Sequence, residues 1–202
     1  MSTKRVWLFR LLIIIGIAAL AFSWFQPWWS THISQMPGTE WPVKIRPYGL
    51  DVAGFWEVIT LLPQGGHEAD MPVWFTPVMW VYFGLVCLLL VVSLFFIKNK
   101  QIGLIGKKFN LSSFLLFGVG VSYILVAILA VVVASIRLKV IGLPLTGEVF
   151  LELGTYSIWE LESTAFSTLR FGFWLAVATG PFLVLLGILR NKIVGKQQAI
   201  SQ

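Results

Sequence analysis

Residues 111–136 read LSSFLLFGVGVSYILVAILAVVVASI, a predominantly apolar stretch without a charged side chain. At roughly 1.5 Å per helical residue, such a stretch is long enough to cross a hydrocarbon core of about 30 Å. Three further apolar stretches of similar length occupy residues 6–25, 74–97 and 169–189. Because a bilayer core offers no water to pair with backbone groups, each stretch must be a helix. The sequence therefore predicts an all-α membrane protein built as a four-transmembrane-helix bundle.

The composition of the whole chain indicates the same class. Its 202 residues are 57% hydrophobic and 12% charged, and their mean hydropathy is +0.85. Soluble globular domains are much less apolar, so we expect residues 1–202 to form a single membrane domain. The pI of about 9.7 then reflects membrane topology and contact with anionic lipid, and does not indicate nucleic-acid binding.

Charge is distributed unevenly around the predicted helices. Loop 98–110 and the two ends of the chain carry most of the Lys and Arg residues, whereas loops 26–73 and 137–168 carry all nine Asp and Glu residues. Cytoplasmic flanks are enriched in basic residues, so we expect both termini and loop 98–110 in the cytoplasm and the two long loops outside a plasma membrane. The basic start and Ala19-Leu20-Ala21 also fit a cleaved secretory signal, but the apolar run continues beyond them, which favours a retained helix.

Short patterns in the outer loops predict a small extracytoplasmic β-cap. Residues 43–46 alternate apolar and basic side chains, which is typical of a half-buried strand. Residues 148–153 and 155–162 have the character of two further strands. Residues 51–62 place apolar side chains at helical spacing and predict a short amphipathic helix.

Small residues recur inside two of the predicted helices. Gly172, Ala176 and Gly180 follow one another at four-residue spacing, and Gly118 and Ser122 do the same in the third helix. Small side chains let helix backbones approach closely. We expect these residues to pack helices within the bundle, with dimerisation as the alternative.

Tryptophans gather near the predicted outer ends of the helices, at Trp24, Trp28, Trp29, Trp74 and Trp174. An amphipathic indole ring is stable between apolar and wet layers, so these residues predict an interfacial aromatic belt. Docking of a partner subunit is the alternative role.

Both histidines have a methionine four residues further on, in the pairs His32/Met36 and His67/Met71. Imidazole and thioether ligands together suit copper better than zinc, calcium or magnesium. If the loop folds back, the two pairs can form one extracytoplasmic copper site. The alternative is that both histidines are ordinary solvated loop residues and that Met71 begins the second helix.

Several chemistries are disfavoured. The interiors of the four apolar stretches lack ionisable residues, which disfavours a proton relay or an ion-coupled transporter. The histidines lie outside the helices, so they cannot ligate haem within the bundle. Cys87 has no second cysteine for thiol–disulfide chemistry. We therefore expect a non-catalytic accessory subunit of a larger membrane complex, and we expect this subunit to hold no resident cofactor. Two alternatives stay open. The first is the copper-binding module, and the second is a lipid- or quinone-binding subunit that uses Tyr82, Ser122 and Tyr123.

The first outer loop contains Trp41 and, further on, Tyr48-Gly49-Leu50. With four helices, cytoplasmic termini and a long first outer loop, this pattern resembles the claudin and peripheral-myelin-protein tetraspan superfamily. Asp51 stands where that family has a tryptophan, and the family's loop cysteine pair is absent. The resemblance implies architecture only: a helical bundle with an outer β-cap that makes lateral protein contacts, and not a paracellular seal.

Overall fold

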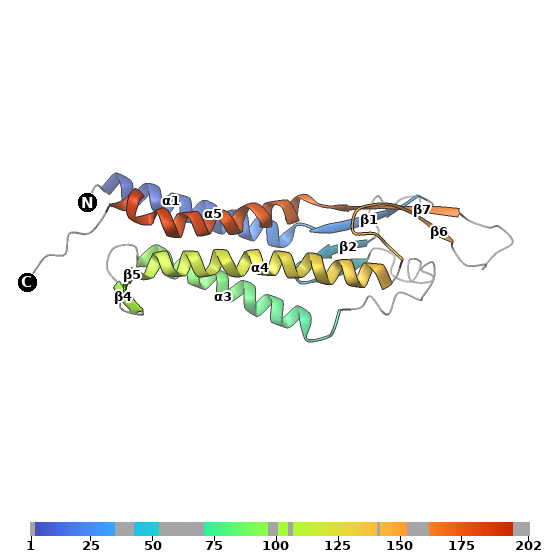
Figure 1. Ribbon diagram of the computed structural model, residues 1–202, viewed down its shortest axis with the longest axis horizontal. Coiled ribbons are helices and arrows are strands. Elements are labelled where there is room, and N and C mark those ends of the chain that lie inside the picture. The colour runs from blue at the N-terminus through green and yellow to red at the C-terminus, as the bar shows by residue number, and fades with distance from the viewer. Residues whose placement is uncertain are drawn as a thin grey trace, which may run out of the picture. The chain divides into compact units, whose positions relative to one another are not determined.

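The computed structural model describes residues 3–34, 43–52, 71–96, 101–104, 107–140, 142–152 and 162–195. In these ranges the chain forms four long helices, a five-stranded sheet and a separate two-stranded sheet (Figure 1). The helices are α1 (Thr3–Phe25), α3 (Phe75–Phe95), α4 (Leu111–Val140) and α5 (Phe171–Val194). The strands are β1 (Trp29–Ile33), β2 (Val43–Arg46), β3 (Gly49–Val52), β4 (Gln101–Leu104), β5 (Lys107–Asn110), β6 (Gly147–Glu152) and β7 (Glu162–Leu169).

All four helices are long and apolar enough to cross a membrane, as the hydropathy pattern predicts. Their ends differ from the prediction in two instructive places. Helix α4 continues to Val140, so Arg137 and Lys139 lie in its last turn and not in an outer loop. Basic side chains interact favourably with the free carbonyls of a helix C-terminus, which explains this extension. Helix α5 begins at Phe171, because the preceding Leu169 pairs with Trp29 in the sheet.

The five-stranded sheet is antiparallel, with the strand order β3-β2-β1-β7-β6. It therefore combines three strands from the first predicted outer loop with two from the second. The strand predicted at residues 43–46 is confirmed as β2, and the one at 148–153 corresponds to β6.

Two other outer-loop predictions fall mostly outside the described residues. The strand predicted at 155–162 lies outside the described residues except at Glu162, which belongs to β7 (Glu162–Leu169). The amphipathic helix predicted at 51–62 is contradicted at Asp51 and Val52, which belong to β3, and its remaining residues lie outside the described ranges. Strands β4 and β5 form a hairpin within the loop 98–110, for which the sequence analysis gave no strand.

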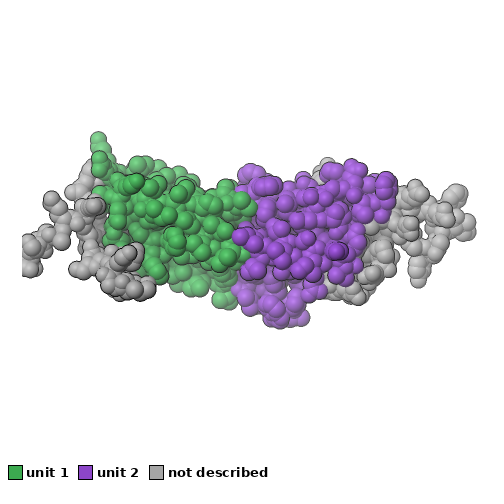
Figure 2. Space-filling view, viewed as in Figure 1, with its two compact units in different colours: residues 1–21, 81–126, 175–202 green, residues 22–80, 127–174 purple. Residues whose placement is uncertain are grey.

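The chain divides into two compact units, coloured separately in Figure 2. Unit 1 comprises residues 1–21, 81–126 and 175–202, and unit 2 comprises residues 22–80 and 127–174. All four long helices contribute residues to both units, and the five-stranded sheet belongs entirely to unit 2.

Unit 1 contains segments of all four helices and the β4–β5 hairpin, and apolar side chains from the helices fill its interior. Ile13 of α1, Leu90 of α3, Leu116 of α4 and Leu183 of α5 are completely buried. Other large apolar side chains of the same helices remain exposed. They include Ile14, Ile15, Leu85, Leu88, Phe117, Leu125, Leu185 and Ile188. Helices that are apolar on both their inner and outer faces are typical of membrane spans.

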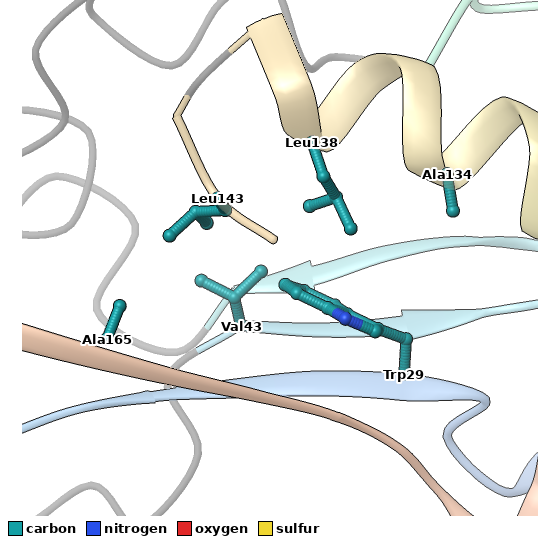
Figure 3. Packing of buried hydrophobic residues seen from close by; sticks show 6 residues of the cluster. All are labelled: Trp29, Val43, Ala134, Leu138, Leu143 and Ala165. Atoms are coloured by element: carbon teal, nitrogen blue, oxygen red, sulfur yellow. The ribbon is translucent and has the colours of Figure 1, made fainter. Parts of the chain in front are cut away.

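Unit 2 has its core between the sheet and the C-terminal part of α4. Trp29 of β1 is only 1% exposed, and its ring lies beside Val43 of β2, with Leu138 and Ala134 projecting toward it from α4 (Figure 3). Its indole N–H donates a hydrogen bond to the Leu145 carbonyl at 2.7 Å. This contact satisfies the polar atom of a buried indole and fixes the ring in place.

Candidate functional site

Helices α4 and α5 approach each other most closely at glycines. A Cβ atom placed on Gly120 would lie 2.7 Å from the Gly180 carbonyl oxygen and 2.7 Å from the Val184 nitrogen. One placed on Gly187 would lie 2.8 Å from the Ser113 carbonyl oxygen. Gly118 is exposed, and a Cβ atom there would meet nothing within 4 Å. The glycine of α4 in this crossing is therefore Gly120, which the four-residue spacing did not single out.

The other predicted small residues also lie at close contacts. Ala176 is completely buried. Gly172 lies in the first turn of α5, next to the chain that follows α1, and an added Cβ atom there would lie 2.7 Å from the Pro27 carbonyl oxygen. Close by, Ser23 at the end of α1 donates a hydrogen bond to the Gly172 carbonyl at 2.8 Å. These contacts pack α1 against α5 inside unit 2.

Hydroxyl groups join α3 to α4 at two levels of unit 1. Ser122 donates to the Val119 carbonyl at 2.9 Å, so Tyr82, 3.2 Å from the same Ser122 oxygen, acts as the donor in that pair. Ser93 and Ser112 form a second buried pair at 3.1 Å. Tyr123, the third residue of the predicted lipid or quinone site, is completely buried. The Tyr82 and Ser122 hydroxyls thus serve contact between helices.

The five predicted belt tryptophans fall into two groups. Trp74 and Trp174 are 64% and 57% exposed, as an interfacial position requires. Trp24, Trp28 and Trp29 are buried inside unit 2, so their rings pack against protein. For Trp29 the reason is strand pairing over a long sequence distance: β1 begins at Trp29 and pairs with β2 and with β7, which holds this residue in the core.

The predicted copper ligands are only partly placed. His32 lies in β1 opposite Phe166 of β7. Met71 is half-buried ahead of α3, whereas Met36 and His67 lie outside the described residues. Within the described ranges, no group of three or more His, Cys, Asp or Glu side chains could hold a metal ion. The four-residue copper site stays a prediction, which metal analysis of the purified protein before and after His32→Ala would test.

A polar strip crosses the middle of the sheet. Ser167 of β7 donates to the Thr31 hydroxyl of β1 at 3.1 Å, and Arg170 donates to the Ser30 hydroxyl. Ser30 and Thr31 are completely buried, so these side-chain bonds reinforce the β1–β7 pairing from both faces.

The basic end of unit 1 holds a polar cluster that the sequence analysis did not single out. The Asn191 side-chain oxygen accepts hydrogen bonds from Arg190 Nη1 at 2.9 Å and from Asn110 Nδ2 at 3.0 Å. Asn110 immediately precedes α4, and the other two residues lie near the end of α5. The available signal was an Arg-Asn pair at the end of an apolar run.

Comparison of the sequence with protein-family models and with curated proteins finds no match in either.

Proposed function

We propose that the protein is a non-catalytic tetraspan of a plasma membrane that acts as a structural or accessory subunit of a larger membrane complex. The observation that carries the proposal is the use of polar side chains within the apolar helices. Tyr82, Ser93 and Ser23 each bond to a neighbouring helix. Such bonds hold helices together where hydrophobic association is weak, as it is in lipid.

The exposed surface of the helices supports a membrane location. Ile14, Leu129 and Leu185 are large apolar side chains on three different helices, and all three are exposed. The exposed rings of Trp74 and Trp174 suit the boundary between lipid and water. Loops 26–73 and 137–168 would then lie outside the cell, and the termini inside.

The sheet supplies a surface for lateral protein contacts. Phe150 of β6 is 78% exposed, and Phe166 of β7 is also exposed. Since Phe150 pairs with Thr164 and Glu148 pairs with Phe166, both rings lie on the same face of the sheet in a diagonal arrangement. Exposed neighbouring aromatics of this type are enriched where proteins dock.

The decisive experiment is to solubilise the native membrane gently and determine the mass and polypeptide content of the particle that contains this chain. Comigration with other subunits is expected. A protein that migrates alone, with no copurifying polypeptide, would refute the accessory role. Phe150→Glu should release the partners, whereas Thr146→Glu adds the same charge at another exposed position of the same loop and should leave the complex intact.

A further inference from the structure

Strand β6 forms one edge of the five-stranded sheet, and within the described residues β7 is the only strand that pairs with it. Two backbone hydrogen bonds at the ends of β7 show how this strand divides its groups between its neighbours. The Ser34 N–H donates to the Thr164 carbonyl at 3.0 Å, and the Arg170 N–H donates to the Trp28 carbonyl at 2.8 Å. Even-numbered residues of β7 therefore bond to β1, and its odd-numbered residues bond to β6.

The same alternation fixes which groups of β6 face the edge of the sheet. Val149 pairs with Ala165 of β7, so its backbone N–H and C=O point toward β7. Glu148 and Phe150 direct theirs the other way, along the edge. Because Val149 packs on the core cluster, the side chains of Glu148 and Phe150 lie on the outer face, where both are exposed. In this part of the chain the edge thus presents two backbone donors and two acceptors beside a carboxylate and an aromatic ring.

Charge decides which strand can pair with this edge. Strand β6 contains Glu148 and Glu152 but no Lys or Arg, and unit 2 as a whole has nine acidic against five basic residues. If a second copy of β6 paired antiparallel with Phe150 opposite Phe150, Glu148 would stand opposite Glu152. Like charges directly opposite each other destabilise a strand pair, and charged edge strands protect sheets from such self-association. A strand with basic residues gains stability at the same positions.

We propose that the β6 edge binds an extended segment of a partner subunit as an additional antiparallel strand, with a basic side chain opposite Glu148 and an apolar side chain opposite Phe150. The backbone groups of these two residues supply affinity, and the two side-chain positions supply specificity. The basic and apolar residues of the partner stand two positions apart, because side chains alternate between the faces of a strand. This inference rests on the accessory role proposed above and specifies the kind of segment that the partner contributes.

The test uses the full chain, purified in dodecylmaltoside, and a synthetic peptide that carries a neutral fluorophore. The lysine peptide is acetyl-Thr-Lys-Thr-Val-Thr-Lys-Thr-amide, and the glutamate peptide replaces both lysines by glutamate. Fluorescence anisotropy measures binding at equal ionic strength. The lysine peptide should bind at least about 10-fold more tightly, since two cross-strand charge pairs change from attractive to repulsive. Absence of binding by the lysine peptide, or equal affinities of the two peptides, would overturn the inference.

N-methylated peptides separate strand addition from diffuse charge attraction. An N-methyl group on the central valine of the lysine peptide removes an N–H that faces β6, so affinity should fall at least about 10-fold. The same group on the adjoining threonine alters an N–H that points away from β6, and affinity should be retained. Equal affinities of these two peptides would show that backbone pairing is absent.

Glu148→Lys is the matching change in the protein. It should reverse the preference, so that the glutamate peptide binds more tightly than the lysine peptide, and a folding defect cannot produce such a reversal. A variant that still prefers the lysine peptide would remove Glu148 from the site and contradict the proposal.

The remaining outcomes separate this inference from the proposed function. A purified chain that forms a dimer which the lysine peptide dissociates would assign the edge to a second copy and overturn the basic partner. A native particle that contains partner subunits, from a chain that does not bind the lysine peptide, overturns only the strand addition. A chain that binds the peptide as expected but migrates alone from the native membrane overturns only the accessory role.

Discussion

Replacing Gly120 by alanine tests the close crossing of α4 and α5. The added Cβ atom would lie 2.7 Å from two backbone atoms of α5, the Gly180 oxygen and the Val184 nitrogen, whereas ordinary contacts are 3.4–4 Å. Backbone atoms cannot rotate away, so α4 and α5 must separate along this crossing. Overpacking of this kind typically costs about 1–3 kcal/mol.

Gly118→Ala is the matched control, because it makes the same change two residues away in the same helix, where a Cβ atom would meet nothing within 4 Å. Both substitutions gain helix propensity, so their difference isolates the packing cost. For a chain of this size that difference corresponds to about 3–10 °C in Tm. Thermal unfolding in dodecylmaltoside, followed by tryptophan fluorescence, measures it directly. Equal Tm values for Gly118→Ala and Gly120→Ala would refute the close approach of α4 and α5.

Three further outcomes follow from the structure. Trp29→Ala should destabilise the protein by about 3–5 kcal/mol, because the ring is buried in the core of unit 2. Trp174→Ala, at an exposed position, should change the free energy of unfolding by less than about 1 kcal/mol, and denaturant titration of both variants measures the difference. Ser23→Ala should cost about 1 kcal/mol in the same assay, because it removes the buried hydrogen bond by which Ser23 joins α1 to the Gly172 carbonyl of α5. On a cysteine-free background, Phe150→Cys should react with an impermeant maleimide in intact cells, whereas Lys192→Cys should react only after the cells are permeabilised. The reverse pattern of labelling would contradict the proposed orientation.

The helices were predictable because a span needs only length and hydrophobicity, and both are local properties of the sequence. Their ends were less predictable, since tertiary contacts decide them. Leu169 looks like the first residue of an apolar helix, but its pairing with Trp29 keeps it in β7. Helix α4 likewise runs past the apolar stretch to Val140, because its last basic residues suit a helix C-terminus.

The sheet was only half predictable for a related reason. Val43–Arg46 alternates clearly, and β2 lies where the alternation predicts it. Strand β1, by contrast, consists of WSTHI, whose tryptophan and histidine equally suit a membrane boundary or a metal site. What makes it a strand is pairing with β7, more than 130 residues away for the Thr31–Ser167 pair. Sequence periodicity carries no information on such a partner, so the burial of Trp29 could not be foreseen.

Charged side chains are distributed differently in the two units. In unit 2 acidic and basic side chains coexist, and Arg46 forms an ion pair with Asp51 at 3.3 Å. Unit 1 contains no Asp or Glu residue, because all nine lie in unit 2. Exposed lysines tolerate this imbalance through water and counterions, and the buried guanidinium of Arg190 donates a hydrogen bond to the Asn191 side-chain oxygen at 2.9 Å.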